Sequence, residues 1–224
     1  MRSYSLLIFL LFFSFLSSKG QENTRNDLLG NQYSWSSFEL IKMDSKGEFL
    51  FSWQNPSGGE IIWVDPSNPF RILTFTKESN QIIWLDNKLS PIGDPISLDQ
   101  LGMLDISGIC VSKDGGLWAF DQSTRLLIKL DQNLKKQIEA PFRIKLDNSA
   151  KAWVPMMEWK QQLYFLTPSE QIIVTDLFGQ VSKHIPLNAK SMHVNNAGLL
   201  FITEHDSYQY SPETGMLKSL IKKP

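Results

Sequence analysis

The sequence predicts an all-β protein with the architecture of a β-propeller, and three observations support this prediction. A two-strand pattern recurs every 45 residues, and its copies end at Asp86, Asp131 and Asp176. Apolar residues come in short runs separated by turn residues, without helical periodicity. The second strand of each unit is apolar on both faces, as in Leu117–Phe120 and Leu163–Leu166. A repeat of this length is typical of a propeller blade, and a strand buried on both faces lies between two sheets.

The repeat divides the chain into blades. We expect blades over residues 60–97, 105–140 and 151–186, and a shorter, less regular one over 189–220. The segment Phe38–Trp53 matches the second half of a unit and lacks an obvious first strand. We therefore predict about five four-stranded blades, with four or six as alternatives. We also predict that strands from both termini complete the first blade, because ring closure removes exposed strand edges.

The beginning of the chain has the pattern of a secretory signal peptide. Its apolar stretch, Leu6–Leu16, is too short to span a bilayer. The small residues Ser18 and Gly20 precede a cleavage point before Gln21. The pattern predicts export to the periplasm or the exterior, and because no cysteine lies near residue 20, not as a lipoprotein.

We divide the chain into a signal peptide (1–20), an N-terminal extension (21–37) and a single propeller domain (38–224). Within the extension, residues 32–36 are the candidate for a missing first strand. No other stretch is long and apolar enough to cross a membrane, so we expect no transmembrane segment in the mature chain.

Charge and cysteine content argue against two classes of function, nucleic-acid binding and catalysis by a thiol. Without its leader the chain keeps 20 basic against 23 acidic residues, which argues against a nucleic-acid partner. The single cysteine, Cys110, lies in an apolar context that indicates a buried strand residue rather than a catalytic thiol.

The repeated aspartates have two interpretations. Asp44, Asp86, Asp131 and Asp176 each follow an apolar strand and precede a turn. They would form either a ring of carboxylates for a metal ion or strand-end turns in which each carboxylate accepts backbone N–H groups. We favour the second interpretation, because a fold repeat requires the same residue in every blade.

The departures from the repeat supply the candidate contact residues. In the turn Asp65–Arg71, we single out Asp65, Asn68 and Arg71, which would contact a ligand or form a rigid connector with Asp65 paired to Arg71. In a second segment, we single out Trp153, Glu158 and Trp159, which would line a channel mouth or pack between blades.

No motif assigns catalytic, cofactor-binding or metal-binding residues. His184, His193 and His205 are spaced by 9 and 12 residues, which matches no metal-ligand motif. Nothing in the chain matches a nucleophile elbow, a phosphate-binding loop or a zinc-protease helix. We therefore expect no cofactor.

The blades resemble those of a known class. The unit running from Gly116–Asp121 to Leu127–Asp131 resembles the blades of six-bladed NHL and TolB-like propellers, although the chain is short for six blades. The segments Asp65–Ile72 and Trp84–Leu89 are similar to a group of short secreted propellers of Bacteroidota. The resemblance covers nearly all of residues 38–220, and because that group has no established activity, it implies fold and compartment alone.

These observations favour a secreted, non-catalytic binding or scaffold module for a protein or a cell-envelope component. The alternatives are a hydrolase or lyase acting on a sugar or lactone, and a sugar-binding lectin, each using the central channel. Carboxylates with raised pKa converging in the channel would favour an enzyme. A channel closed by Trp, Met and Leu would favour the binding module.

Overall fold

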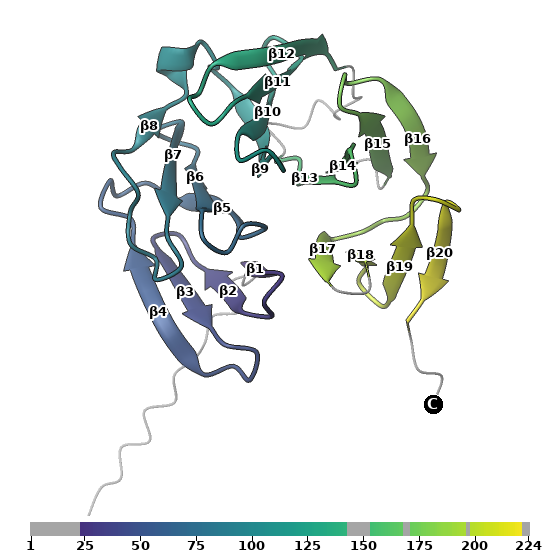
Figure 1. Ribbon diagram of the computed structural model, residues 1–224, viewed down its shortest axis with the longest axis horizontal. Helices are drawn as coiled ribbons and strands as arrows, with labels where there is room; N and C mark the ends of the chain where they lie inside the picture. The colour runs from purple at the N-terminus through teal and green to yellow at the C-terminus, as the bar shows by residue number, and fades with distance from the viewer. Residues whose placement is uncertain (1–22, 143–152, 168–170, 196–197, 221–224) are drawn as a thin grey trace, which may run out of the picture.

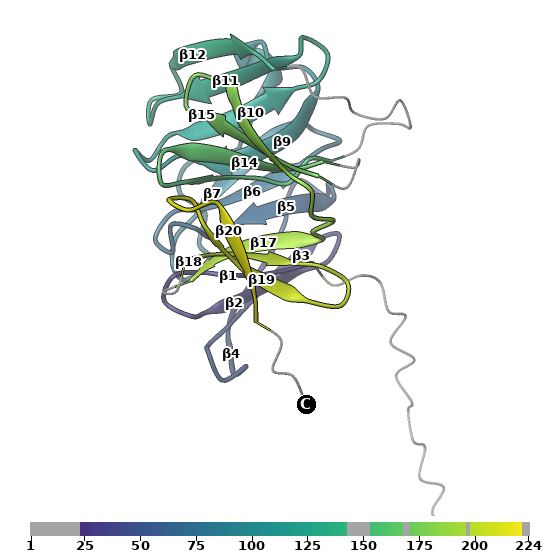
Figure 2. The same ribbon diagram turned by 90° about the vertical axis from the view of Figure 1, so that its right-hand side faces the viewer.

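Five four-stranded antiparallel sheets form this protein, here as a computed structural model that describes residues 23–142, 153–167, 171–195 and 198–220. The sheets surround a central axis like the blades of a propeller (Figure 1). Figure 2 shows the same ring from the side. The predicted all-β propeller of five four-stranded blades is confirmed.

Each blade consists of four strands that follow one another in the chain. Blade 1 contains β1 (Asn23–Asn26), β2 (Gln32–Trp35), β3 (Glu39–Met43) and β4 (Phe49–Gln54). Blade 2 contains β5 (Ile61–Asp65), β6 (Ile72–Thr76), β7 (Gln81–Leu85) and β8 (Ile96–Ser97), followed by the 3₁₀ helix η1 (Asp99–Leu101). Blade 3 contains β9 (Ile106–Val111), β10 (Leu117–Asp121), β11 (Leu126–Leu130) and β12 (Lys136–Pro141). Blade 4 contains β13 (Met156–Trp159), β14 (Gln162–Leu166), β15 (Ile172–Asp176) and β16 (Val181–Ile185). Blade 5 contains β17 (Ser191–Asn195), β18 (Gly198–Ile202), β19 (Ser207–Ser211) and β20 (Met216–Ser219).

The first blade differs from the sequence-based expectation. Strands β1 and β2 lie within residues 21–37, so most of the expected extension belongs to the propeller. The prediction that strands from both termini share one blade is wrong, because blade 1 is built from β1–β4 alone. The reason lies in β2, whose Tyr33 and Trp35 are buried in the core against blade 2. The expected signal peptide (1–20) lies outside the described residues.

Four hydrophobic cores hold consecutive blades together. One joins blades 1 and 2, another blades 2 and 3, a third blades 3 and 4, and the last blades 4 and 5. Strand β10 shows why the sequence is apolar on both faces. Leu117 and Ala119 pack toward blade 2, whereas Trp118 and Phe120 pack toward blade 4.

Blades 5 and 1 meet differently. The first strands β1 and β17 lie side by side, whereas the outer strands β4 and β20 diverge (Figure 1). Among the described residues, no hydrophobic cluster joins these two blades. Ile41 of blade 1 and Leu200 of blade 5 lie on the faces turned away from the cores and are partly exposed. We call this junction the open seam.

The repeated aspartates fasten the turns between the third and fourth strands. Each side chain accepts the backbone N–H groups of the residues two and four positions later, at 2.8–2.9 Å. The four are Asp44, Asp86, Asp131 and Asp176. The structural interpretation of these carboxylates is confirmed.

Cys110 on β9 is buried in the core between blades 3 and 4, and its burial raises the pKa of the thiol well above the usual value. Its surroundings agree with a structural role. In the part of the chain that the structure describes, no helix has the length and apolar character required to cross a membrane.

Candidate functional site

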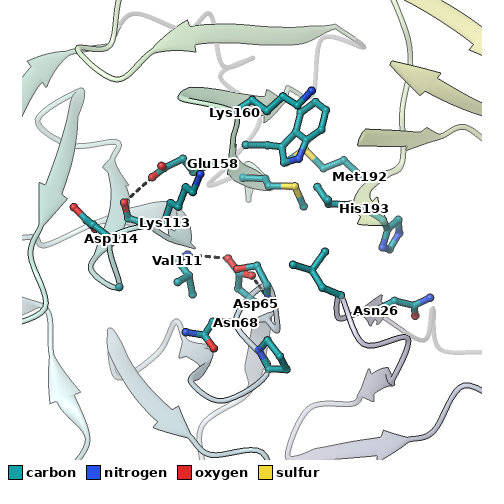
Figure 3. Close-up of a pocket in the computed structure, with 18 of the residues that line it drawn as sticks. Asn26, Asp65, Asn68, Val111, Lys113, Asp114, Glu158, Lys160, Met192 and His193 are labelled. Atoms are coloured by element: carbon teal, nitrogen blue, oxygen red, sulfur yellow. Dashed lines mark hydrogen bonds between the residues drawn. The ribbon is translucent and has the colours of Figure 1, made fainter. Parts of the chain in front are cut away.

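A hollow of about 660 Å³ opens at one end of the central channel (Figure 3). It lies where the first strand of each blade ends and the loop to the second strand begins. Every blade contributes to its lining, through residues that include Asn26, Asp65, Val111, Trp159 and His193. We call this hollow the funnel. Its size is in the range of small-ligand pockets.

Adaptable apolar side chains form much of the funnel wall. Met157 and Trp159 come from blade 4 and Met192 from blade 5. Leu28, in the loop between β1 and β2, contributes to the lining and is 50% exposed. Methionine and tryptophan are typical of surfaces that accommodate partner side chains.

The hairpin between β13 and β14 positions Trp159. Lys160 and Gln161 both have positive φ, at 47° and 61°, as in a two-residue type I′ turn. Lys160 lies over the Trp159 ring, with Nζ 4.8 Å from the centroid, and forms an ion pair with Glu213 of blade 5. The turn therefore places an aromatic ring and a cation together at the rim of the funnel.

Asp65 is buried, and each of its carboxylate oxygens accepts a backbone N–H. Its Oδ1 accepts the N–H of Ser67 at 3.0 Å, and its Oδ2 accepts the N–H of Val111 on blade 3 at 2.8 Å (Figure 3). Arg71 does not pair with it. The Arg71 guanidinium instead donates to the Gly115 carbonyl at 2.6 Å and stacks over Trp84.

Glu158 ties blade 4 to blade 3 at the funnel. Its Oε2 accepts hydrogen bonds from the Ser112 hydroxyl at 2.6 Å and from the Trp118 indole N–H at 2.8 Å. Asp114 is engaged as well, by Lys129 Nζ and by the N–H of Gly116. Burial opposes ionisation of Asp114, but these contacts outweigh it and lower the pKa of the carboxyl.

The candidate contact residues separate into two groups. The structure brings Asp65, Asn68, Glu158 and Trp159 together in the lining of the funnel. Arg71 lies outside this lining, in the junction of blades 2 and 3. Trp153 packs on the core of the same junction, with its ring 5.3 Å from Phe75 and stacked on it.

Sequence reasoning missed two residues near the funnel. Arg25 on β1 is 5% exposed, and its guanidinium lies 3.8 Å above the Trp63 ring. His193 on β17 lines the funnel, and burial, assisted by the charge of Arg25, lowers its pKa to about 4. Arg25 lies in a segment without apolar residues, and the spacing of His193 from the other histidines gives no sign that it lines the funnel. His184 and His205 lie elsewhere, on β16 and in the loop before β19.

Comparisons with known proteins identify similar folds but assign no function to this chain. No family model matches the sequence, and no curated protein sequence matches it. The fold is similar to virginiamycin B lyase from Staphylococcus aureus, with 14% identity and a TM-score of 0.55 over 89% of this chain and 70% of that chain.

It is also similar to a protein of unknown function from Bacteroides caccae, with 10% identity and a TM-score of 0.59 over 84% of this chain and 71% of that chain. The fold is similar as well to the Pan2 WD40 domain of Neurospora crassa, with 8% identity and a TM-score of 0.58 over 88% of this chain and 64% of that chain. The chain thus spans about two thirds of these structures. At such identities the similarity shows a β-propeller fold alone.

Proposed function

We propose that this chain is an exported, non-catalytic β-propeller that uses the funnel to bind a segment of a protein or of another cell-envelope component. The observation that carries this proposal is the funnel itself, a hollow of about 660 Å³ to which all five blades contribute. Because every blade contributes residues to the funnel, the ring fixes the positions of these residues relative to one another. A concave site of this kind is suited to binding a protruding segment of a partner.

The funnel wall indicates the chemistry of the bound segment. Trp159, Met157 and Met192 offer apolar contact area, and half-exposed Leu28 extends it to the rim. Burial of one large apolar side chain in such a site contributes about 1.5–3 kcal/mol. We therefore expect the bound segment to present an aromatic or long aliphatic group.

The acidic groups of the funnel support binding rather than acid–base catalysis. Both oxygens of Asp65 hold backbone N–H groups, and Glu158 holds two side-chain donors from blade 3. At Asp114, the hydrogen bonds and the charge of Lys129 lower the pKa of the carboxyl rather than raise it. The funnel carboxylates thus form hydrogen bonds and ion pairs that connect residues within one blade or in neighbouring blades.

Site-directed crosslinking tests the proposal. A photoreactive residue at Leu28, on the funnel, is compared with one at Phe178, an exposed residue on the turn after β15. We expect the Leu28 probe alone to capture a defined envelope component, and Trp159→Ala to abolish the capture. Equal capture at both positions, or none at Leu28, would contradict a funnel-based function.

Export is tested separately. We expect the protein secreted by its native host to begin at Gln21, as determined by mass spectrometry of the intact chain. A cell-associated protein that retains residues 1–20 would contradict export with cleavage.

A further inference from the structure

A buried arginine lies at the centre of the ring. Arg25 comes from blade 1 and stacks on Trp63 of blade 2. Its electrostatic neighbours are Asp65 of blade 2, Cys110 of blade 3 and His193 of blade 5. Because these neighbours belong to the first strands of different blades, the guanidinium lies where those strands converge, close to Asp65 and His193 of the funnel lining.

The Arg25 guanidinium has no anionic partner in the described residues: none of the ion pairs and hydrogen bonds formed there involves it. The carboxylate oxygens of Asp65, the acidic neighbour, accept hydrogen bonds from the N–H groups of Ser67 and Val111. Burial lowers the pKa of Arg25 to about 10, and the charge of Asp65 only partly opposes this effect. A buried cation without a hydrogen-bonded partner is costly.

The Trp63 ring beside Arg25 also carries a donor that lacks an acceptor among the described residues. The indole N–H of Trp63, whose ring supports the guanidinium, is buried and has no hydrogen-bond partner in the part of the chain that the structure describes. The same holds for the indole N–H of Trp153, whose ring lies 5.5 Å from that of Trp63. Nε2 of His193 is already hydrogen-bonded to the Ser191 hydroxyl, at 3.0 Å. The ring that supports the guanidinium therefore carries an unpaired donor, and an unpaired donor beside a buried cation is suited to an anion.

We propose that Arg25 receives a carboxylate group of the molecule that binds in the funnel. This inference rests on the proposed binding role of the funnel and assigns the charge of its ligand. Asn26, which follows Arg25, and His193, its electrostatic neighbour, both line the funnel. A guanidinium offers two parallel N–H donors to a planar carboxylate.

Titration of the mature chain with acetate tests the site without any partner. The readouts are the imidazole NMR signals of His193 and the indole N–H signal of Trp63, and acetamide serves as the neutral control. We expect a saturable shift of both signals with acetate and none with acetamide. Arg25→Gln should weaken acetate binding about 10- to 100-fold. Arg125→Gln, the same change at an exposed arginine, should leave it unchanged.

Three results would overturn the inference: no saturable shift up to about 100 mM acetate, equal shifts with acetamide, or saturation by inorganic phosphate but not by acetate. If Arg25→Gln does not fold, the acetate–acetamide contrast in the wild-type chain decides, together with Arg25→Lys, which keeps the charge and loses the two-donor geometry.

The anion site and the proposed function fail separately. Acetate binding without capture by the Leu28 probe would support the site and reject the binding role of the funnel. Capture by the Leu28 probe without acetate binding would support the binding role of the funnel and reject the anion site.

Discussion

The junction of blades 2 and 3 and the open seam between blades 5 and 1 join sheets of the same kind, but only the first encloses a core. In the former, Trp63 and Phe75 are buried against Leu117 of the next blade, and Asp65 holds the N–H of Val111 across it. At the seam, the first strands β1 and β17 lie side by side, and no hydrophobic cluster of the described residues joins the two blades. The difference teaches that this ring is held by four sequential junctions rather than by closure.

Two neighbouring leucines on β18 give the sharpest test of this comparison. Leu199 is fully buried against blade 4, whereas Leu200 faces the seam and is partly exposed. Leu199→Ala should lower the free energy of unfolding by about 2–5 kcal/mol. Leu200→Ala should lower it by about 1 kcal/mol or less. Urea unfolding of both variants measures the contrast, and equal losses would mean that the seam is packed like the other junctions.

The second prediction concerns pH and the inner edge of the seam. His193 has its pKa lowered from 6.5 to about 4 in the folded chain, first by burial and then by Arg25. Between about pH 4 and pH 6.5, His193 binds a proton in the unfolded chain but not in the folded chain. Stability is therefore complete above pH 6.5 and falls as the pH drops toward 4, by up to about 3 kcal/mol.

The measurement compares unfolding free energies at pH 7 and pH 4.5 for the wild type and for His193→Gln. The variant should lose less stability on acidification, because it lacks this proton-linked contribution. Identical pH dependence in both proteins would show that His193 is already solvated at the seam.

Glu158 tests a polar tie across a packed junction. Glu158→Ala leaves the buried indole N–H of Trp118 without its acceptor, and we expect a loss of about 1–3 kcal/mol. Glu158→Gln keeps an acceptor oxygen and should cost less. Chemical denaturation of the two variants measures the difference. If both variants match the wild type, the apolar core alone holds blades 3 and 4 together.

The smallest effect is expected at the exposed ion pair of Lys160 and Glu213, which connects blades 4 and 5 at the surface. Glu213→Gln should leave the thermal unfolding midpoint unchanged within error, because solvent screens such pairs. A clear decrease would show that surface charges, and not only the core, align the last blade.

The sequence predicted the elements whose apolar residues are buried on both faces. The blades over 60–97, 105–140, 151–186 and 189–220 agree with the sheets observed, because their strands carry the pattern that burial between two neighbours imposes. Strand β1 escaped prediction, because Asn23–Asn26 contains no apolar residue and borders the seam.

The site was predicted in part for a similar reason. Asp65 ends an apolar strand and Glu158 interrupts one, so both stand out in the sequence, and both line the funnel. Arg71 and Trp153 also stand out, but their chemistry serves the junction of blades 2 and 3. Arg25 gives no local signal, because its burial depends on the convergence of strands far apart in the chain.

Because each blade is made of consecutive strands, the protein is topologically a linear array bent into a ring. Its stability then resembles a sum of blade terms and nearest-neighbour terms, as in solenoid proteins. The faces of blades 1 and 5 at the seam contain partly exposed residues such as Ile41 and Leu200. Blade number can therefore change by duplication or loss of one unit without breaking a shared strand.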